Sequence, residues 1–162
     1  MNRRQLMLLL SGAMAAPHPL CAQQKAMPVI GFLGSGSPGP NAPLVAAFRE
    51  GLSETGWVEG RNLAIEHRWA EGRYDLLPAL AADLVAHKAD LIAASSIPSA
   101  QAAKSVTPTV PIVFVSGGDP VELGLVAGRA RPGGNLTGVS ILAAELTPKR
   151  LELLSELVHQ AG

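Results

Sequence analysis

Cysteine is almost absent from this sequence of 162 residues. The single cysteine, Cys21, excludes a disulfide bond within the chain, so cysteine pairing gives no information on the redox compartment. Tryptophan and tyrosine are also scarce, and only Trp57, Trp69 and Tyr74 offer such rings for stacking on a ligand. We expect Trp57, which follows a predicted helix, to pack over the core. Trp69, at the end of a predicted strand, is expected nearer a binding cleft.

An excess of basic residues is missing as well. Thirteen lysines and arginines balance thirteen aspartates and glutamates, whereas domains that bind nucleic acid usually present a basic face. Beyond the first residues, no apolar run is long enough to cross a bilayer as a helix. We therefore expect a mature chain that is soluble, has no nucleic-acid partner and is not stably inserted in a membrane.

Residue patterns for metal binding and for covalent catalysis are lacking. His67, His87 and His159 are not spaced to place two imidazoles on one face of an element, so no metal site is expected. None of the loop serines stands in a Gly-x-Ser-x-Gly elbow, which disfavours a hydrolase. The sequence thus predicts a protein that is not an enzyme, with no catalytic residues and no cofactor.

The amino-terminal segment is typical of a secretory signal peptide. Arg3 and Arg4 precede an apolar run that is too short to span a bilayer, and Pro17 ends that run. We predict cleavage near Ala22 and export to the periplasm, through either the Sec or the twin-arginine route. A lipid anchor on Cys21 is the alternative, which the bulky residues before that cysteine disfavour.

Removal of the predicted signal peptide, residues 1–22, leaves one domain at residues 23–162. The removal takes away two arginines and no acidic side chain, so the mature domain carries 11 basic against 13 acidic residues. A chain of about 140 residues is long enough to bury a single hydrophobic core.

Short apolar runs bounded by turn residues alternate with segments of helical periodicity. The runs predict strands at residues 28–33, 62–69, 90–94, 111–115 and 135–139, and the periodic segments predict helices near residues 44–52, 76–85, 99–106 and 146–158. Such alternation with short connections is typical of parallel strands joined by right-handed crossovers. The predicted fold class is therefore α/β, a doubly wound parallel sheet with helices on both faces.

Three loops at the carboxyl ends of the predicted strands share a chemistry. In a doubly wound sheet, ligands bind beyond these ends, near the point where the strand order reverses. The candidate ligand-binding residues lie in loops 34–41, 95–99 and 116–120: Ser35, Gly36, Ser37, Ser95, Ser96, Pro98, Ser99, Gly117, Gly118 and Asp119. Each loop also starts a helix, whose free N–H groups can hold an anion such as a carboxylate. Helix capping would explain any one of these residues, and their convergence on one edge favours a site.

The segment 34–39 matches the dinucleotide-binding fingerprint G-x-G-x-x-G and follows a predicted strand. The third glycine of that fingerprint belongs inside a helix, yet Gly39 lies between Pro38 and Pro40, where a helix interior is not feasible. A nucleotide-dependent enzyme of the doubly wound class that uses the loop from Gly34 to Gly39 is therefore the weaker alternative function.

Three segments carry a family resemblance: residues 48–62 (FREGLSETGWVEGRN), 118–126 (GDPVELGLV) and 131–140 (RPGGNLTGVS). In this order they resemble the ABC-transporter substrate-binding family often called the tryptophan/tyrosine-type binding proteins. The resemblance runs from about residue 27 to the end of the chain. It implies a type I periplasmic-binding fold, in which two doubly wound lobes joined by a hinge hold a small ligand in the cleft between them. The three serine-rich loops would form one side of that cleft.

The resemblance also implies a function. The chain would be the amino-terminal lobe of the solute-binding component of an ABC-type importer, which captures a small polar or amino-acid-like ligand and delivers it to a membrane permease. Members of the family are about twice as long as this chain, so the second lobe is absent from residues 23–162. A degenerate lobe that binds another protein is a further alternative.

Overall fold

The computed structural model describes residues 27–141 and 143–160, so the predicted signal peptide and Cys21 lie outside the described residues. In chain order the elements are β1 (Val29–Gly34), α2 (Ala42–Glu54), β2 (Ala64–Trp69), the 3₁₀ helix η1 (Tyr74–Leu76), α3 (Leu77–Ala86), β3 (Leu91–Ala94), α4 (Ile97–Val106), β4 (Ile112–Ser116), β5 (Leu136–Ser140) and α5 (Ala143–Gln160). Every strand and helix predicted from the sequence is confirmed, with ends shifted by up to three residues.

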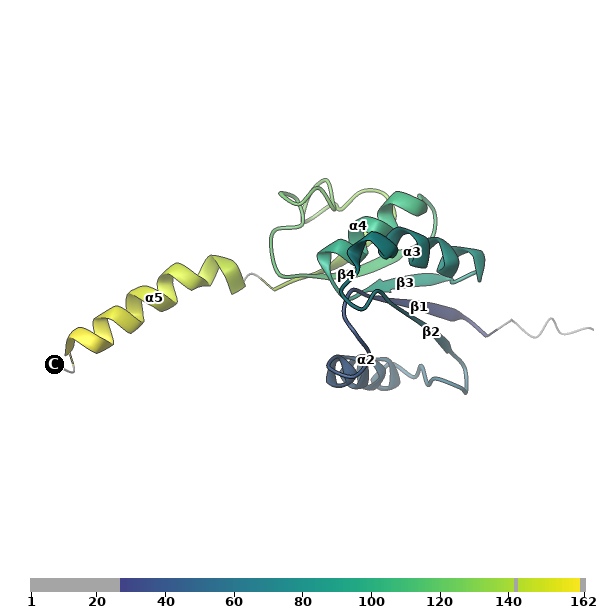
Figure 1. The fold of residues 1–162 in the computed structure, drawn as a ribbon, viewed down its shortest axis with the longest axis horizontal. Coiled ribbons are helices and arrows are strands. Elements are labelled where there is room, and N and C mark those ends of the chain that lie inside the picture. The colour runs from purple at the N-terminus through teal and green to yellow at the C-terminus, as the bar shows by residue number, and fades with distance from the viewer. Residues whose placement is uncertain (1–26, 142, 161–162) are drawn as a thin grey trace, which may run out of the picture.

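The strands form one parallel sheet in the order β2–β1–β3–β4–β5. Figure 1 shows α3 and α4 on one face of this sheet and α2 on the other. This arrangement confirms the predicted doubly wound α/β fold. The chain runs from β1 outward to β2 and then crosses back to β3, so the strand order reverses between β1 and β3.

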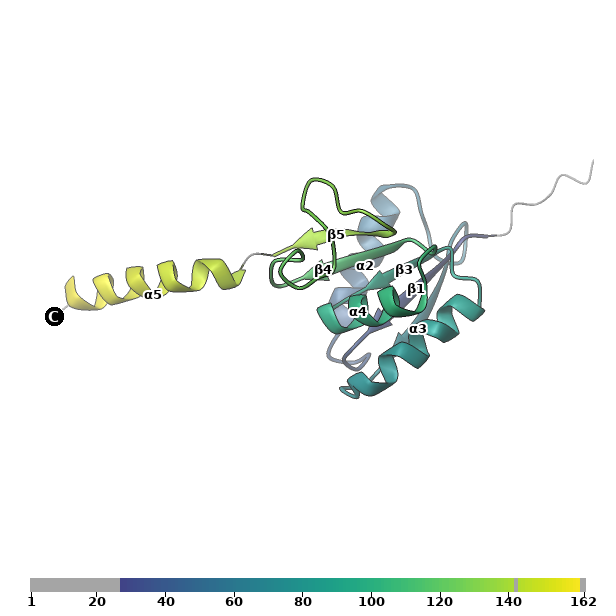
Figure 2. The same ribbon diagram turned by 90° about the horizontal axis from the view of Figure 1, so that it is seen from above.

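The face under α3 and α4 holds the main hydrophobic core, and Figure 2 shows these two helices over the strands. Ile92, Ile112 and Phe114 point from the sheet into this core and are at most 2% exposed. On α3, Leu84 is fully buried. Gly31 of β1 makes room for it, since a Cβ at Gly31 would lie 2.9 Å from both Leu84 methyl carbons.

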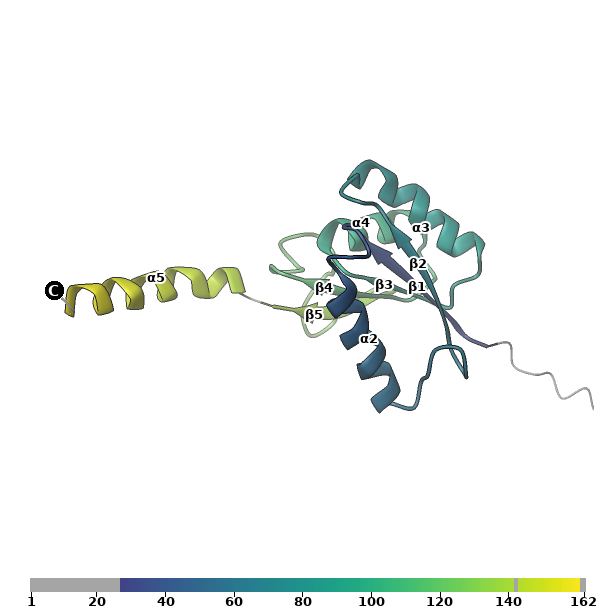
Figure 3. The same ribbon diagram turned by 60° about the horizontal axis from the view of Figure 1, so that its bottom comes forward.

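The opposite face is covered by α2 over only part of the sheet (Figure 3). Val45 of α2 packs with Phe32 of β1 and Ala93 of β3 in a second, smaller cluster. Beyond this cluster the apolar side chains of β4 and β5 are exposed, and we call them the open apolar face: Val113 (38%), Val115 (41%) and Val139 (63%).

Helix α5 lies apart from the sheet in Figures 1 to 3. Its apolar stripe, which the sequence pattern predicted, is 57–65% exposed at Leu151, Leu154, Leu157 and Val158. The helix is therefore confirmed, but the described residues do not bury its stripe. Every helix in the described part of the chain is too short or too polar to cross a bilayer.

The helix starts bring the loops to one edge of the sheet. Pro43, Pro78 and Pro98 stand at the second position of α2, α3 and α4, where proline fits because the N–H it lacks would have no helical partner. At the other end of α2, Gly56 takes a φ of +88°, and its N–H donates to the Ser53 carbonyl oxygen at 2.9 Å. Because these helices begin and end sharply, the connections between the strands that they join are short.

Candidate functional site

The three serine-rich loops follow β1, β3 and β4, which are neighbours in the sheet. Their strands are parallel, so all three loops lie at the carboxyl edge. Loops 34–41 and 95–99 stand on the two strands between which the order reverses, the usual ligand position in this architecture. The structure therefore brings the predicted site residues to one edge of the sheet.

The loop after β1 is held by main-chain hydrogen bonds to the loop after β2. The N–H of Gly72 donates to the Ser35 carbonyl oxygen at 2.8 Å, and the N–H of Glu71 donates to the Gly36 carbonyl oxygen at 3.0 Å. Asn41 Nδ2 donates to the Ser37 carbonyl oxygen at 2.8 Å. Gly39 lies outside α2, so the third glycine of the dinucleotide fingerprint is not in a helix.

The loop after β3 caps helix α4. Ser96 Oγ accepts a hydrogen bond from the Ser99 N–H at 3.3 Å and lies 2.8 Å from Ser99 Oγ. Ser99 is fully buried beneath the loop, whereas Ser95, Ser96 and Pro98 are half-buried. Ser95 ties the loop to β1, since both its N–H and its hydroxyl donate to the Leu33 carbonyl oxygen, at 3.1 and 3.3 Å.

The loop after β4 is built around the buried hydroxyl of Ser116. This hydroxyl donates to the Gly118 carbonyl oxygen at 2.7 Å and accepts from the Gly118 N–H at 3.2 Å. Ser140, at the end of β5, donates to the same Gly118 carbonyl oxygen at 3.0 Å. Gly117 is exposed at the tip of the loop, and Gly118 is half-buried. The carbonyl of Gly118 is thus fixed from both neighbouring strands.

Asp119 closes this loop as a local cap. Its Oδ1 accepts the Val121 N–H at 2.9 Å, and its Oδ2 accepts from Arg129 Nη2 at 2.7 Å. The hydrogen bond from Val121, followed by that from Arg129, lowers the pKa of the Asp119 carboxyl below its usual value. Both oxygens are therefore engaged within the lobe, and the residue shapes the loop that it ends.

The predicted site offers neutral hydrogen-bonding groups. Of its ten predicted residues, Asp119 alone is charged, and it is paired with Arg129. Hydroxyls, main-chain N–H groups and the start of α4 suit a polar or zwitterionic solute. No cluster of three or more histidine, cysteine, aspartate or glutamate side chains that could hold a metal ion occurs in residues 27–141 and 143–160 as described.

A crevice beside these loops contains two residues that we did not predict as site residues, Arg49 and His67. Together with Pro38 and Trp69, they line a cavity of about 360 Å³ between α2 and β2. The spacing of His67 and Trp69, two residues apart on one strand, indicates a shared face. How close His67 and Trp69 lie to Arg49 depends on the packing of α2 against β2. The alternation of residues along a strand gives no information on that packing.

The two tryptophans lie at opposite ends of the sheet. Trp69 ends β2 at the carboxyl edge, as the sequence predicted for a residue near the cleft. Trp57 was expected to pack over the core, but it is 44% exposed and lines a groove with Ile30 and Leu63. Its indole therefore covers the core only in part, because α2 ends before it and the chain turns at Gly56.

Comparison with known proteins places the chain in a family. Residues 41–161 match the family described as ABC transporter substrate binding protein. The chain belongs to this family. It is 38% identical over 114 residues to the tyrosine-binding protein of Clostridioides difficile (strain R20291), a match that covers 70% of this chain and 32% of that protein.

Solved structures of other proteins share the fold. One is an ABC domain in complex with L-Trp from Streptococcus pneumoniae (30% identity, TM-score 0.64, 70% of this chain and 38% of that one). Another is the ligand-free, open form of a substrate-binding protein with adhesive properties from Clostridium difficile (32%, 0.65, 70% and 38%). A conserved domain protein from Vibrio cholerae matches over 80% of this chain and 43% of its own (29%, 0.71). The chain thus spans about a third to two fifths of the length of these relatives.

Proposed function

We propose that this chain is the amino-terminal lobe of the solute-binding component of an ABC-type importer and has no catalytic activity. The observation that carries the proposal is the convergence of three serine-rich loops at the carboxyl edge, on the strands where the order reverses. These loops present hydrogen-bonding groups and no paired nucleophile and base. Family membership and the tyrosine- and tryptophan-binding relatives support the same function.

The ligand we propose is a small polar or amino-acid-like solute. Half-buried Ser35, Ser37, Ser95 and Ser96 supply hydroxyls that can form hydrogen bonds with a carboxylate. Such groups recognise a zwitterion by hydrogen bonds and need no metal or cofactor. The solute would then be delivered to a membrane permease of the same transporter.

The cleft that holds this ligand requires a second lobe, which we propose for the full-length protein. Two surfaces of the described lobe fit a further structural unit: the open apolar face of the sheet and the exposed stripe of α5. The size of the matched relatives is consistent with such a unit. We also propose that the protein is exported to the periplasm, with the signal peptide cleaved near Ala22.

Thermal unfolding of the full-length exported protein tests this function. The protein is heated with each of a panel of amino acids, nucleobases and small organic acids. A ligand at about one hundred times its dissociation constant adds about 2.7 kcal/mol to the free energy of unfolding, which raises the midpoint temperature. We expect such a shift with one class of amino-acid-like compounds, and no shift with any compound would contradict a solute-binding function.

A matched pair of serine variants then locates the site. Ser95→Ala removes a half-buried hydroxyl from the loop after β3, so the midpoint shift should shrink. Ser105→Ala removes an exposed hydroxyl further along α4 that donates to the Ala102 carbonyl oxygen, and the shift should remain. Equal shifts in both variants would place the ligand elsewhere.

A further inference from the structure

The crevice between α2 and β2 differs in chemistry from the serine-rich loops. It has a volume of about 360 Å³, within the range of small-molecule sites. One wall is made by Ala42, Val45 and Ala46 of α2, and the other by His67 and Trp69 of β2. Arg49 is the only charged residue in its lining. The crevice therefore combines apolar walls, two aromatic rings and one cation.

The aromatic wall is held in place by the strand beneath it. Trp69 lies against Gly34 so closely that a Cβ at Gly34 would overlap the indole ring. Phe32 contacts the rings of Trp69 and His67, with centroids 5.3 Å from each. The His67 and Trp69 rings are parallel within 2°. These contacts hold the indole ring of Trp69 in place, and a planar ligand can stack against it.

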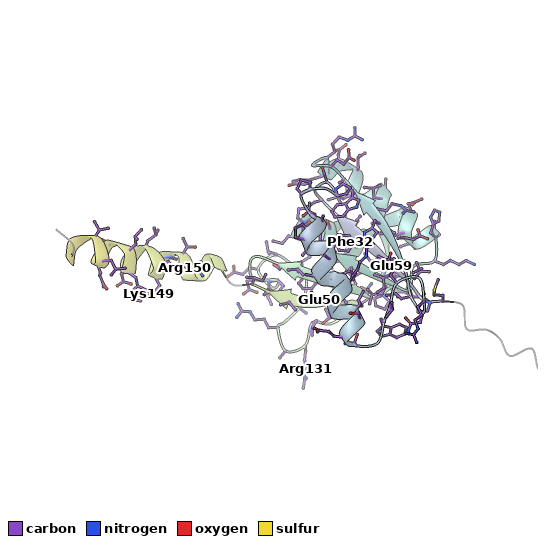
Figure 4. All side chains as sticks on the ribbon, turned by 90° about the horizontal axis from the view of Figure 1, so that it is seen from below. Phe32, Glu50, Glu59, Arg131, Lys149 and Arg150 are labelled. Carbon is purple, nitrogen blue, oxygen red and sulfur yellow. The ribbon has the colours of Figure 1, made fainter. Side chains whose placement is uncertain are left out.

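Arg49 supplies the positive charge and is oriented by two contacts. Its Nε donates to Glu59 at 2.5 Å, and its Nη2 lies 3.4 Å from His67 Nε2. Figure 4 shows Glu59 beside α2, whereas Lys149 and Arg150 lie far away on α5. The Nε and Nη2 groups form one edge of the guanidinium, which leaves the edge formed by Nη1 and Nη2 for the two oxygens of a carboxylate.

The residues that line the crevice favour a ligand that carries a negative charge and no ammonium group. Its lining contains no acidic side chain that would pair with an ammonium. His67 adds no positive charge near neutral pH, because burial and the nearby Arg49 lower the pKa of its imidazole. The imidazole therefore acts as part of the aromatic wall. Arg49, whose Nε pairs with Glu59 outside the lining, binds the carboxylate of the ligand through its remaining edge.

We propose that this crevice is a second binding site, separate from the amino-acid site, for a small planar carboxylic acid such as an aromatic acid. The carboxylate pairs with Arg49, and the ring stacks against Trp69. This proposal does not depend on the solute-binding function, because it uses none of the ten loop residues assigned to that site.

Tryptophan fluorescence reports directly on this site. Residues 1–162 contain two tryptophans, so Trp57→Phe leaves Trp69 as the only tryptophan among them. In this background the full-length protein is titrated with benzoate and, separately, with benzamide, which has the same shape and no charge. We expect benzoate to quench Trp69 in a saturable way and to bind at least about tenfold more tightly than benzamide.

Two arginine variants test the cation. Arg49→Gln should raise the dissociation constant of benzoate about tenfold and leave that of benzamide unchanged. Arg61→Gln removes an exposed arginine outside the crevice and should change neither. No saturable quenching up to about 20 mM benzoate would overturn the proposal. Equal affinity for benzoate and benzamide, or no effect of Arg49→Gln, would overturn it as well.

The two sites are distinguished by competition. A saturating amino acid that binds the serine-rich loops should leave the benzoate titration unchanged, and Ser95→Ala should weaken only amino-acid binding. Displacement of benzoate by that amino acid would place both in one site and overturn the proposal. If no amino acid binds but benzoate still depends on Arg49, the second site stands and the proposed solute-binding function fails.

Discussion

The two faces of the sheet differ in how completely they are covered. Beneath α3 and α4, Ile112 and Phe114 of β4 are at most 2% exposed. On the α2 side of the same strand, Val113 and Val115 are 38% and 41% exposed. The side chains alternate along one strand, so neighbouring residues of similar hydrophobicity have very different surroundings. One face is a finished core, whereas the other retains apolar surface that a further part of a protein could cover.

The covered face stabilises the described lobe, whereas the open apolar face remains available for contacts with other surfaces. The covered face holds most of the buried apolar residues, and hydrophobic stabilisation scales with the apolar area that is buried. The open apolar face and the stripe of α5 contribute little, because their side chains remain in water. Four substitution experiments test how far the two faces differ.

The largest effect is expected from truncating one side chain on each face of β4. Ile112→Ala leaves a cavity in the covered core and should lower the free energy of unfolding by about 2–5 kcal/mol. Val113→Ala, the next residue, should change it by about 0.5 kcal/mol or less. Urea unfolding of both variants measures the two values. Similar losses would mean that the open apolar face is covered in solution.

A smaller effect is expected where β5 packs against β4. A Cβ at Gly138 would overlap the Phe114 carbonyl oxygen and approach its ring at 2.7 Å. Gly138→Ala should therefore destabilise the lobe by about 1–3 kcal/mol, the usual cost of overpacking. Gly39→Ala is the control, since no atom lies within 4 Å of a Cβ there. A stable Gly138→Ala variant would show that β5 shifts easily on β4.

A pH effect is expected from His67, which lies under α2. Burial and Arg49 lower the pKa of His67 in the folded state, so below about pH 6.5 the unfolded chain binds more protons. The stabilisation by the neutral imidazole is complete above that pH and is lost as the pH falls from there through the lowered pKa of the folded state. Urea unfolding between pH 7.5 and pH 5 should show a drop that His67→Phe reduces. A drop of the same size in His67→Phe would contradict this role of His67.

The smallest stability effect is expected from Val113→Thr combined with Val115→Thr. Both side chains are partly exposed, so the free energy of unfolding should change by about 0.5 kcal/mol or less per site. Binding of a hydrophobic dye to the described lobe should decrease, because exposed apolar patches bind such dyes. Unchanged dye binding would assign the apolar surface to the α5 stripe instead.

The sequence pattern predicted the strands well because each is a short apolar run between glycine, proline or polar residues. Residues 111–115, for example, become β4 with a shift of one residue. The same pattern cannot tell a buried stripe from an exposed one. Leu151 and Leu154 repeat with the periodicity of a packed helix, yet both are more than half exposed. Burial depends on a partner surface that the periodicity of one helix does not encode.

The sequence predicted the position of the three loops but not their hydrogen bonds. Parallel strands bring their carboxyl ends together, so the three loops could be assigned to one edge before the structure was known. Which hydroxyls face solvent depends on local bonding, and Ser99 turns inward to Ser96. The crevice of Arg49 and His67 depends on the packing of α2 against β2, and these two residues lie 18 positions apart.

The end of β5 is hydrogen-bonded to the end of β4 and to the loop that follows it. The N–H of Ile141 donates to the Ser116 carbonyl oxygen at 2.7 Å, and Ser140 holds the carbonyl of Gly118. A displacement of the chain beyond Ile141 therefore also moves the carbonyl of Gly118. We expect tilting of any structure that follows β5 to displace this loop first. By reciprocity, a solute that immobilises the loop would also bias that tilt.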